Sequence, residues 1–126
     1  MILDTNAISA LAQQNRGIAG RLDSARRLAV TFISIGEFAY GIRRSATRQE
    51  LELWLREHLL TRVEILFPDL STLEHYADIR SELRREGTPI PANDIWIAAL
   101  VRQHTLPILS LDKHFDYVKG VSRVDW

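Results

Sequence analysis

The chain has 126 residues and no net charge at pH 7, and 46% of its residues are hydrophobic and 25% charged. This length predicts one domain over residues 1–126 that buries roughly two thirds of the surface of the unfolded chain. The composition excludes a disordered chain, the zero net charge argues against binding nucleic acid through overall charge alone, and the absence of cysteine excludes disulfides, thiolate metal sites and thiol catalysis.

The first third of the chain predicts two strands with helices between them. A short apolar run gives a strand over Ile2–Asp4, and a helix follows over residues 5–13. Residues 15–17 break this pattern before a second helix that runs to about Arg27. Residues 29–33 are nearly all apolar and rich in β-branched side chains, as expected for a strand covered on both faces.

The middle of the chain alternates in the same way. We expect Ser34 to cap a helix with apolar residues at helical spacing. Thr47 and Glu50 have the spacing of a capping box at the start of the next helix. Residues 62–67 alternate between apolar and polar side chains and predict a strand that stops at Pro68.

The last third completes an α/β pattern. A long helix is expected over residues 71–86, ended by Gly87. A helix over residues 93–103 is apolar nearly all round and therefore buried, and residues 107–110 and 122–125 are the last strand candidates. This alternation of strands and helices predicts a three-layer α/β/α domain with a mainly parallel sheet.

No segment predicts a membrane anchor or a secretory signal. The longest apolar run, Ile95–Val101, is far shorter than the ~20 residues that a membrane helix needs. The chain also enters its first strand without the basic and apolar regions of a signal peptide. We therefore expect a cytoplasmic protein with no membrane contact.

Arginine dominates the basic residues, with 14 of the 16. Its planar fork matches phosphate and carboxylate geometry. Most arginines fit solvated helix faces, whereas three adjacent pairs are candidates for phosphate or protein contacts: Arg26-Arg27, Arg43-Arg44 and Arg84-Arg85.

Acidic residues stand where such folds bind ligands, outside the carboxyl ends of parallel strands. The four that follow a predicted strand or begin a predicted helix are Asp4, Glu37, Asp94 and Asp112. Three of them also have an ordinary structural explanation. Asp4 could be a helix N-cap, Glu37 could be the second half of a capping box with Ser34, and Asp112 could belong to a plain turn. Asp94 is harder to explain structurally, because seven residues that look buried follow it.

Taken together, the four acids predict a site for a divalent cation. Crowded carboxylates repel one another, which raises the pKa of some of them unless a cation is present. Mg²⁺ or Mn²⁺, which prefer oxygen ligands, would relieve this repulsion, lower the pKa of bound water and offset charge on a phosphoryl group. Asp116 is an alternative to Asp112 as the fourth acid.

Around these acids the chain resembles PIN-domain ribonucleases, and most closely the small stand-alone toxins of the VapC type. The resemblance covers essentially the whole chain. It rests on four motifs in order: Asp4-Thr5-Asn6, Ser34…Glu37, Asn93-Asp94-Ile95-Trp96-Ile97-Ala98-Ala99 and Ser110-Leu111-Asp112-Lys113-His114-Phe115.

The resemblance implies an Mg²⁺- or Mn²⁺-dependent endoribonuclease that acts as the toxin of a toxin–antitoxin pair. It also implies a homodimer, silenced by a small cognate antitoxin whose tail occupies the cleft. The residues implied to hold the metal and to catalyse are Asp4, Glu37, Asp94 and Asp112, the last at a position that varies in type. Small polar residues implied to orient carboxylates or water are Thr5, Asn6 and Ser110. Arg44, seven residues after Glu37 on the same helix face, is expected to contact the substrate.

Two other α/β protein classes fit this sequence less well, and a PIN-like domain could also act without enzymatic activity. A haloacid-type phosphotransferase needs a second aspartate two residues after the first, where this chain has Asn6. A receiver domain needs a phospho-acceptor aspartate after the third strand and a lysine near the end of the chain. Here the third strand ends in Phe67-Pro68-Asp69 and Lys113 follows an aspartate, so the fit is poor. A non-enzymatic alternative is a PIN-like domain that acts mainly as a binding partner in a DNA-bound regulatory complex. His114 has no i,i+4 partner of the kind found in zinc helices, and its expected role is limited to RNA contact.

Overall fold

The computed structural model describes residues 1–126 and contains a five-stranded sheet in which every strand pair is parallel. The strands are short, and their order across the sheet is β3-β2-β1-β4-β5. Their bounds are β1 (Ile2–Leu3), β2 (Ala29–Thr31), β3 (Glu64–Leu66), β4 (Ile108–Leu109) and β5 (Arg123–Val124). The predicted α/β class with a parallel sheet is confirmed.

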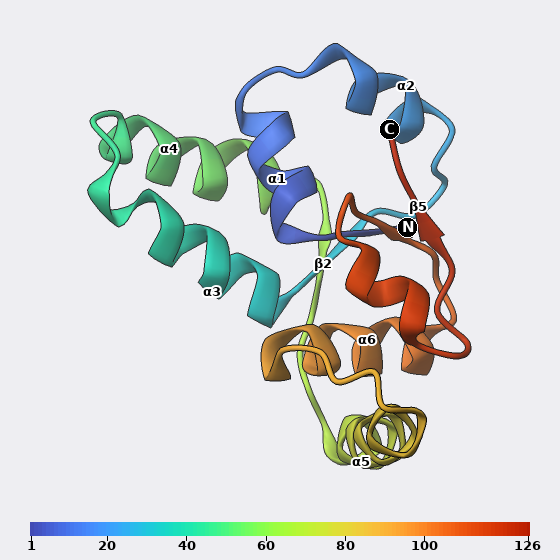
Figure 1. The fold of residues 1–126 in the computed structure, drawn as a ribbon. Helices are drawn as coiled ribbons and strands as arrows, with labels where there is room; N and C mark the ends of the chain where they lie inside the picture. Colours follow the sequence, from blue (N-terminus) through green and yellow to red (C-terminus); the bar gives the residue numbers. More distant parts are fainter.

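Six α-helices cover the two faces of this sheet (Figure 1). Helices α5 and α6 lie on one side of the strands, and α1 to α4 lie on the other. None of the helices is long and apolar enough to cross a membrane. Their bounds are α1 (Thr5–Ala12), α2 (Arg16–Asp23), α3 (Phe32–Gly41), α4 (Arg48–Trp54), α5 (Leu70–Glu86) and α6 (Ala92–His104).

Each central strand contributes to two apolar cores, because successive side chains of a strand point to opposite faces. Ile2 and Ile108 pack in the core beneath α5 and α6, whereas Leu3 and Leu109 pack in the core beneath α1 to α4. All four side chains are fully buried. Burial of such a side chain contributes roughly 1.5–3 kcal/mol, which explains why these strands are apolar without alternation.

Helix α3 begins earlier than the sequence pattern suggested. Its N-cap is Thr31, whose Oγ1 accepts a hydrogen bond from the backbone N–H of Ser34 at 3.0 Å. The prediction that Ser34 caps this helix was therefore wrong, as was the capping box formed by Ser34 and Glu37. Strand β2 also ends at Thr31, whereas the predicted strand continued to Ile33. The difference arises because an apolar run does not reveal where a strand passes directly into a helix.

The remaining differences also lie at the ends of elements. Helix α2 ends at Asp23, before the predicted end, and Thr47 precedes α4 without a side-chain capping bond. Helix α5 is capped by Asp69 through a reciprocal box with Thr72, and it ends at Gly87, whose φ of 70° lies in the left-handed region. Caps depend on which side chain reaches a backbone N–H, and sequence spacing alone allows several choices.

The strand order creates a switch point between β1 and β4. From β1 the chain builds outward through β2 and β3, and it later returns to place β4 on the other side of β1. Open α/β sheets bind ligands outside the carboxyl ends of the strands at such a point. Asp4 directly follows β1 and Ser110 directly follows β4, so this crevice lies between two of the predicted motifs.

Candidate active site

The four predicted acids line one open cleft of about 540 Å³. Asp4 follows β1, and Asp112 follows the end of β4 as the N-cap of a short 3₁₀ helix. Glu37 lies in the second turn of α3, and Asp94 lies in the first turn of α6. Four separate segments therefore bring one carboxylate each to the switch point of the sheet.

Asp4 is the most buried of these acids, with 5% of its surface exposed. One carboxylate oxygen, Oδ2, accepts hydrogen bonds from Ser110 Oγ at 2.7 Å and from Asn6 Nδ2 at 3.1 Å. These donors fix the orientation of the carboxylate and leave Oδ1 free of side-chain donors. Asp4 can therefore offer one oriented oxygen to a ligand in the cleft.

Ser110 and Asn6 join the ends of β1 and β4. Ser110 Oγ accepts from the backbone N–H of Asp112 at 2.9 Å and from Asn6 Nδ2 at 3.2 Å. Asn6 Oδ1 accepts from the backbone N–H of Leu111 at 3.2 Å. This network positions Asp4 and the loop that carries Asp112 as one unit.

Glu37 is held by the first residue of α1. Thr5 Oγ1 donates to Glu37 Oε1 at 3.2 Å across the floor of the cleft. Glu37 lies in the second turn of α3, and its side chain lines the cleft together with Asp94 of α6. A hydrogen bond from the side chain of Asn93, the residue before Asp94, also acts on the Glu37 carboxylate and lowers its pKa.

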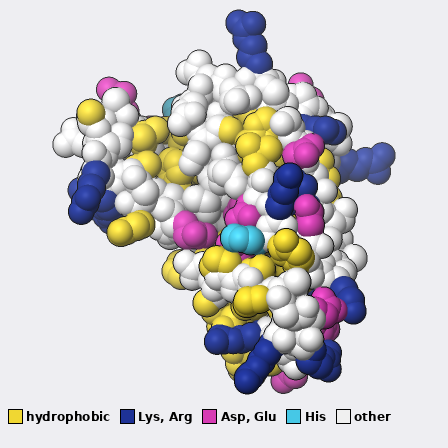
Figure 2. Space-filling model, viewed as in Figure 1, with side chains coloured by type: hydrophobic (Ala, Val, Ile, Leu, Met, Phe, Trp, Pro, Cys, Tyr) yellow, Lys and Arg dark blue, Asp and Glu magenta, His cyan; other side chains and the backbone are white.

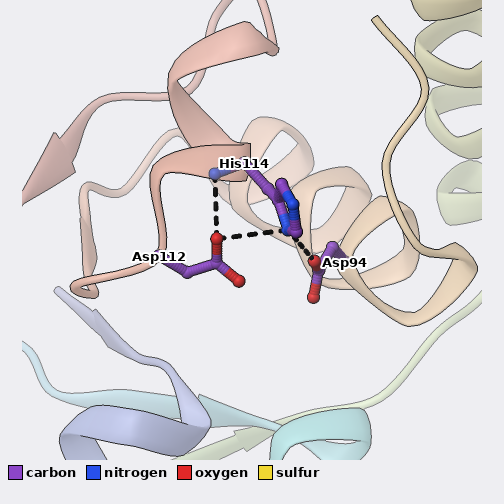
Figure 3. A group of neighbouring side chains, drawn as sticks. All are labelled: Asp94, Asp112 and His114. Carbon is purple, nitrogen blue, oxygen red and sulfur yellow. Dashed lines mark hydrogen bonds and ion pairs between the residues drawn. The ribbon is translucent and has the colours of Figure 1, made fainter.

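His114 links the carboxylates of Asp94 and Asp112 (Figure 3). Its Nδ1 lies 2.9 Å from Asp94 Oδ2 and 3.2 Å from Asp112 Oδ1. The backbone N–H of His114 also donates to Asp112 Oδ1 at 2.9 Å. One ligand atom from each of the three residues lies within 4.8 Å of the others, so the group could hold a metal ion.

Burial raises the pKa of Asp4, Glu37 and Asp94 above the ordinary carboxyl values. Charges on neighbouring carboxylates raise each pKa further, and the hydrogen bonds that the three groups accept do not cancel these effects. The pKa of His114 is also raised, chiefly by its hydrogen bond to Asp94. The charged forms of these carboxylates are therefore destabilised in the folded protein.

A divalent cation that prefers oxygen ligands fits this donor set. No lysine or arginine lines the cleft, whose other polar residues are uncharged: Thr5, Asn6, Ser9, Gln13 and Asn15. Figure 2 shows acidic side chains gathered beside a histidine near the centre of this face, with most basic side chains projecting at its edges. Carboxylates with no lysine or arginine partner suit Mg²⁺ or Mn²⁺.

Two other predicted residues lie outside the cleft. Asp116, the alternative fourth acid, forms a bidentate ion pair with Arg123, at 2.7 Å from Nε to Oδ1 and 3.0 Å from Nη2 to Oδ2. Arg44 is exposed at the end of a 3₁₀ turn that follows α3 and does not line the cleft. Of the two candidates for the fourth acid, only Asp112 lies with the other three.

The contact of His114 with two acids was missed by sequence reasoning. The expected signal for a metal-binding histidine was a partner at i,i+4, whereas its partners are two and twenty residues away. Trp126 was also missed as a lining residue of the cleft. Trp54 packs beside Phe38 and Trp96 stacks on Tyr76, so both tryptophans have packing roles.

Comparison with known proteins assigns this chain and its fold to one family. A profile of the PIN domain matches residues 1–121. The tRNA(fMet)-specific endonuclease VapC of Salmonella typhimurium is 29% identical, and Ribonuclease VapC2 of Haemophilus influenzae is 30% identical, with 99% of this chain and 96% of each relative covered. The DNA-bound VapBC structure from Salmonella typhimurium has a TM-score of 0.86 at 28% identity, with coverage of 99% of this chain and 96% of that one. The chain belongs to the PIN-domain family, among its VapC-type members.

Proposed function

We propose that this protein is an endoribonuclease and the toxin of a toxin–antitoxin pair. The observation that carries the proposal is the cleft in which Asp4, Glu37, Asp94 and Asp112 meet without a lysine or arginine. The similar proteins from Salmonella typhimurium and Haemophilus influenzae are an endonuclease for a tRNA and a ribonuclease. RNA is therefore the substrate class that agrees with both the family and the chemistry.

The proposed cofactor is Mg²⁺ or Mn²⁺, held by Asp4, Asp94 and Asp112 with Glu37 at the side of the site. Such a cation lowers the pKa of water and offsets negative charge on a phosphoryl group. Support comes from the raised pKa values of Asp4, Glu37 and Asp94, because burial and mutual repulsion leave these groups in need of positive charge.

The protein's own residues have distinct roles in the proposed hydrolysis. Water attacks the phosphorus of a phosphodiester, one P–O bond forms, and the P–O bond to the leaving ribose oxygen breaks as that oxygen takes a proton from solvent. Glu37 orients this water through Oε2 and accepts its proton, while Thr5 holds Oε1. Asn6 and Ser110 keep the Asp4 carboxylate in place throughout.

The proposed partners follow from the family and from the charge of the cleft. We infer a homodimer in the cytoplasm, silenced by a small cognate antitoxin. A tail of that antitoxin would occupy the acidic cleft, where a positively charged segment would be stabilised by the carboxylates. The alternative of a domain that only binds partners is not favoured, because the similar proteins are an endonuclease and a ribonuclease.

The deciding experiment is single-turnover cleavage of RNA by purified protein with Mg²⁺ or Mn²⁺. Incubation with total cellular RNA and mapping of new 5′ ends would identify the substrate and the cleaved bond. We expect new ends that require the metal and disappear with EDTA. Full activity in EDTA, or the absence of any new 5′ end with either metal, would contradict the proposal.

A further inference from the structure

His114 brings a nitrogen donor to the proposed metal site. Its Nδ1 lies 2.9 Å from Asp94 Oδ2 and 3.2 Å from Asp112 Oδ1, so that one imidazole contacts carboxylates from two segments (Figure 3). The side chain of Asp94 is only 14% exposed, whereas that of His114 is 44% exposed. The imidazole therefore lies at the solvent side of the two acids.

The loop after β4 fixes the position of this imidazole. Asp112 caps the 3₁₀ helix Lys113–Tyr117 by accepting the backbone N–H of His114 at 2.9 Å. The backbone N–H of Asp112 is in turn bound to Ser110 Oγ at 2.9 Å. Ser110 also holds Asp4, so the same network orients His114 and the buried carboxylate.

The separations of these donor atoms suit one coordination sphere. Adjacent ligands of an octahedral ion with bonds of about 2.1 Å lie about 3 Å apart. The observed separations from Nδ1 to the two carboxylate oxygens, 2.9 Å and 3.2 Å, match that spacing. A cation could therefore bind Nδ1 next to either carboxylate oxygen, and all three atoms lie within 4.8 Å of one another.

We propose that His114 Nδ1 is a direct ligand of the cation held by Asp94 and Asp112, and that this nitrogen makes the site prefer Mn²⁺ over Mg²⁺. The inference rests on the metal site of the proposed function and specifies its ion. Mg²⁺ prefers oxygen ligands in a near-ideal octahedron, whereas imidazole suits transition metals. The remaining carboxylates suit Mn²⁺ as well as Mg²⁺, so the nitrogen decides the preference.

Two other roles for His114 make different predictions. If the imidazole only orients Asp94 through a hydrogen bond, its loss weakens the binding of both ions equally. If the imidazole only fills the site until a cation displaces it, its loss strengthens the binding of both ions. A direct ligand is the one role that changes the ratio of the two affinities.

The test measures binding of Mn²⁺ and Mg²⁺ separately by calorimetry, without RNA. The proteins are the wild type, His114→Ala, His114→Gln and the control His58→Ala, whose exposed side chain lies on the π-helical turn Leu55–Leu59. Loss of an outer-sphere partner of a metal site typically weakens affinity on the order of tenfold, and loss of a direct ligand should cost at least that. We expect this loss for Mn²⁺ in both His114 variants, a much smaller loss for Mg²⁺, and no change in the control.

A spectroscopic measurement tests the metal–nitrogen bond directly. Electron spin-echo modulation from bound Mn²⁺ should show coupling to a coordinated imidazole nitrogen in the wild type and in His58→Ala. That coupling should be absent in His114→Ala and His114→Gln. Equal losses for both ions, tighter binding in His114→Ala, or no nitrogen coupling in the wild type would overturn the inference.

The outcome is separable from that of the proposed function. Nitrogen coupling and Mn²⁺ preference in a protein that cleaves no RNA would support the inference and contradict the proposed function. Metal-dependent cleavage without nitrogen coupling would do the reverse. A protein that binds neither ion would contradict both.

Discussion

The carboxylates at the switch point and those elsewhere on the surface are stabilised in opposite ways. Away from the cleft, Glu82 pairs with Arg102 at 2.9 Å and Asp116 pairs with Arg123 at 2.7 Å. Hydrogen bonds from these arginines lower the pKa of Glu82 and Asp116. In the cleft, burial raises the pKa of Asp4, Glu37 and Asp94, and no arginine or lysine lines the site.

The charge distribution in the cleft is therefore unfavourable for the stability of the folded state. A raised carboxyl pKa means that the folded state binds the proton more tightly than the unfolded state. The resulting loss of stability is absent below the ordinary carboxyl pKa and grows as the pH rises through the raised value. Above the ordinary carboxyl pKa, the ion-paired acids contribute stability, whereas the cleft acids reduce it. A bound cation would therefore stabilise the molecule at the cleft.

The largest expected effect is on cleavage by variants of the cleft acids. Asp4→Ala or Asp94→Ala should reduce single-turnover RNA cleavage on the order of a thousandfold or more, because each removes a proposed metal ligand. Both variants should also relieve growth inhibition, and circular dichroism should show an intact fold. The matched control is Asp116→Ala, which removes a paired acid outside the cleft and should cleave like the wild type. Wild-type cleavage by Asp94→Ala would remove this residue from the mechanism.

Glu37→Gln should have the next largest effect. The substitution keeps the volume and hydrogen bonding of the side chain but removes its charge and basicity, so cleavage should fall on the order of a hundredfold. Thr5→Val, which removes only the hydroxyl that holds Oε1, should cost much less. Single-turnover rates at saturating metal measure both. A Glu37→Gln protein that cleaves at the wild-type rate would show that the charge of Glu37 is not needed.

Metal should stabilise the protein through the cleft acids. At a concentration of one hundred times the Kd, a bound cation adds about 2.7 kcal/mol to the free energy of unfolding, which thermal unfolding would detect as a rise in Tm. Asp94→Asn should reduce this gain. Without metal it should leave the protein as stable as the wild type or more so, because a repelling charge is removed. If Asp94→Asn instead unfolds the metal-free protein and the wild type does not respond to metal, the carboxylate is structural.

A paired acid should respond in the opposite direction. Glu82→Gln should lower the free energy of unfolding at pH 7 by about 1 kcal/mol, because it weakens a partly buried charged hydrogen bond to Arg102. The lowered pKa of Glu82 means that the stabilisation is present above the ordinary value of about 4.3 and is lost as the pH falls through the lowered value. Urea unfolding at pH 7 and in acid would check this. A cost that is equal at both pH values would contradict the ion-pair explanation.

Arg44→Ala should have the smallest effect. Arg44 is exposed, and the neighbouring Arg43 already pairs with Glu52 at 3.5 Å. If Arg44 contacts an RNA phosphate, its loss should weaken RNA binding modestly and to a similar extent for all sequences. It should also reduce the slope of the logarithm of affinity against the logarithm of salt concentration by about one. Binding titrations at several salt concentrations would measure this, with Arg43→Ala as the control. An unchanged slope would exclude the contact.

The sequence by itself determined the class of the fold and the acids of the cleft. The nearly all-apolar run over residues 29–33 is typical of a strand in a sheet that is covered on both faces, and alternation with helices indicates a parallel sheet. Parallel strands end at a common edge, which is why Asp4, after the first strand, could be assigned to a site with acids far away in the chain. Element ends such as Thr31 were less certain, because several neighbouring side chains could serve as the cap.

Only the tertiary structure decided which groups pair. Asp4 accepts from Ser110, 106 residues away, and His114 contacts Asp94, 20 residues away. Of Asp112 and Asp116, only Asp112 lines the cleft, whereas Asp116 pairs with Arg123. Such contacts depend on where distant segments place individual side chains, and the short-range periodicity of a sequence contains no information on that placement.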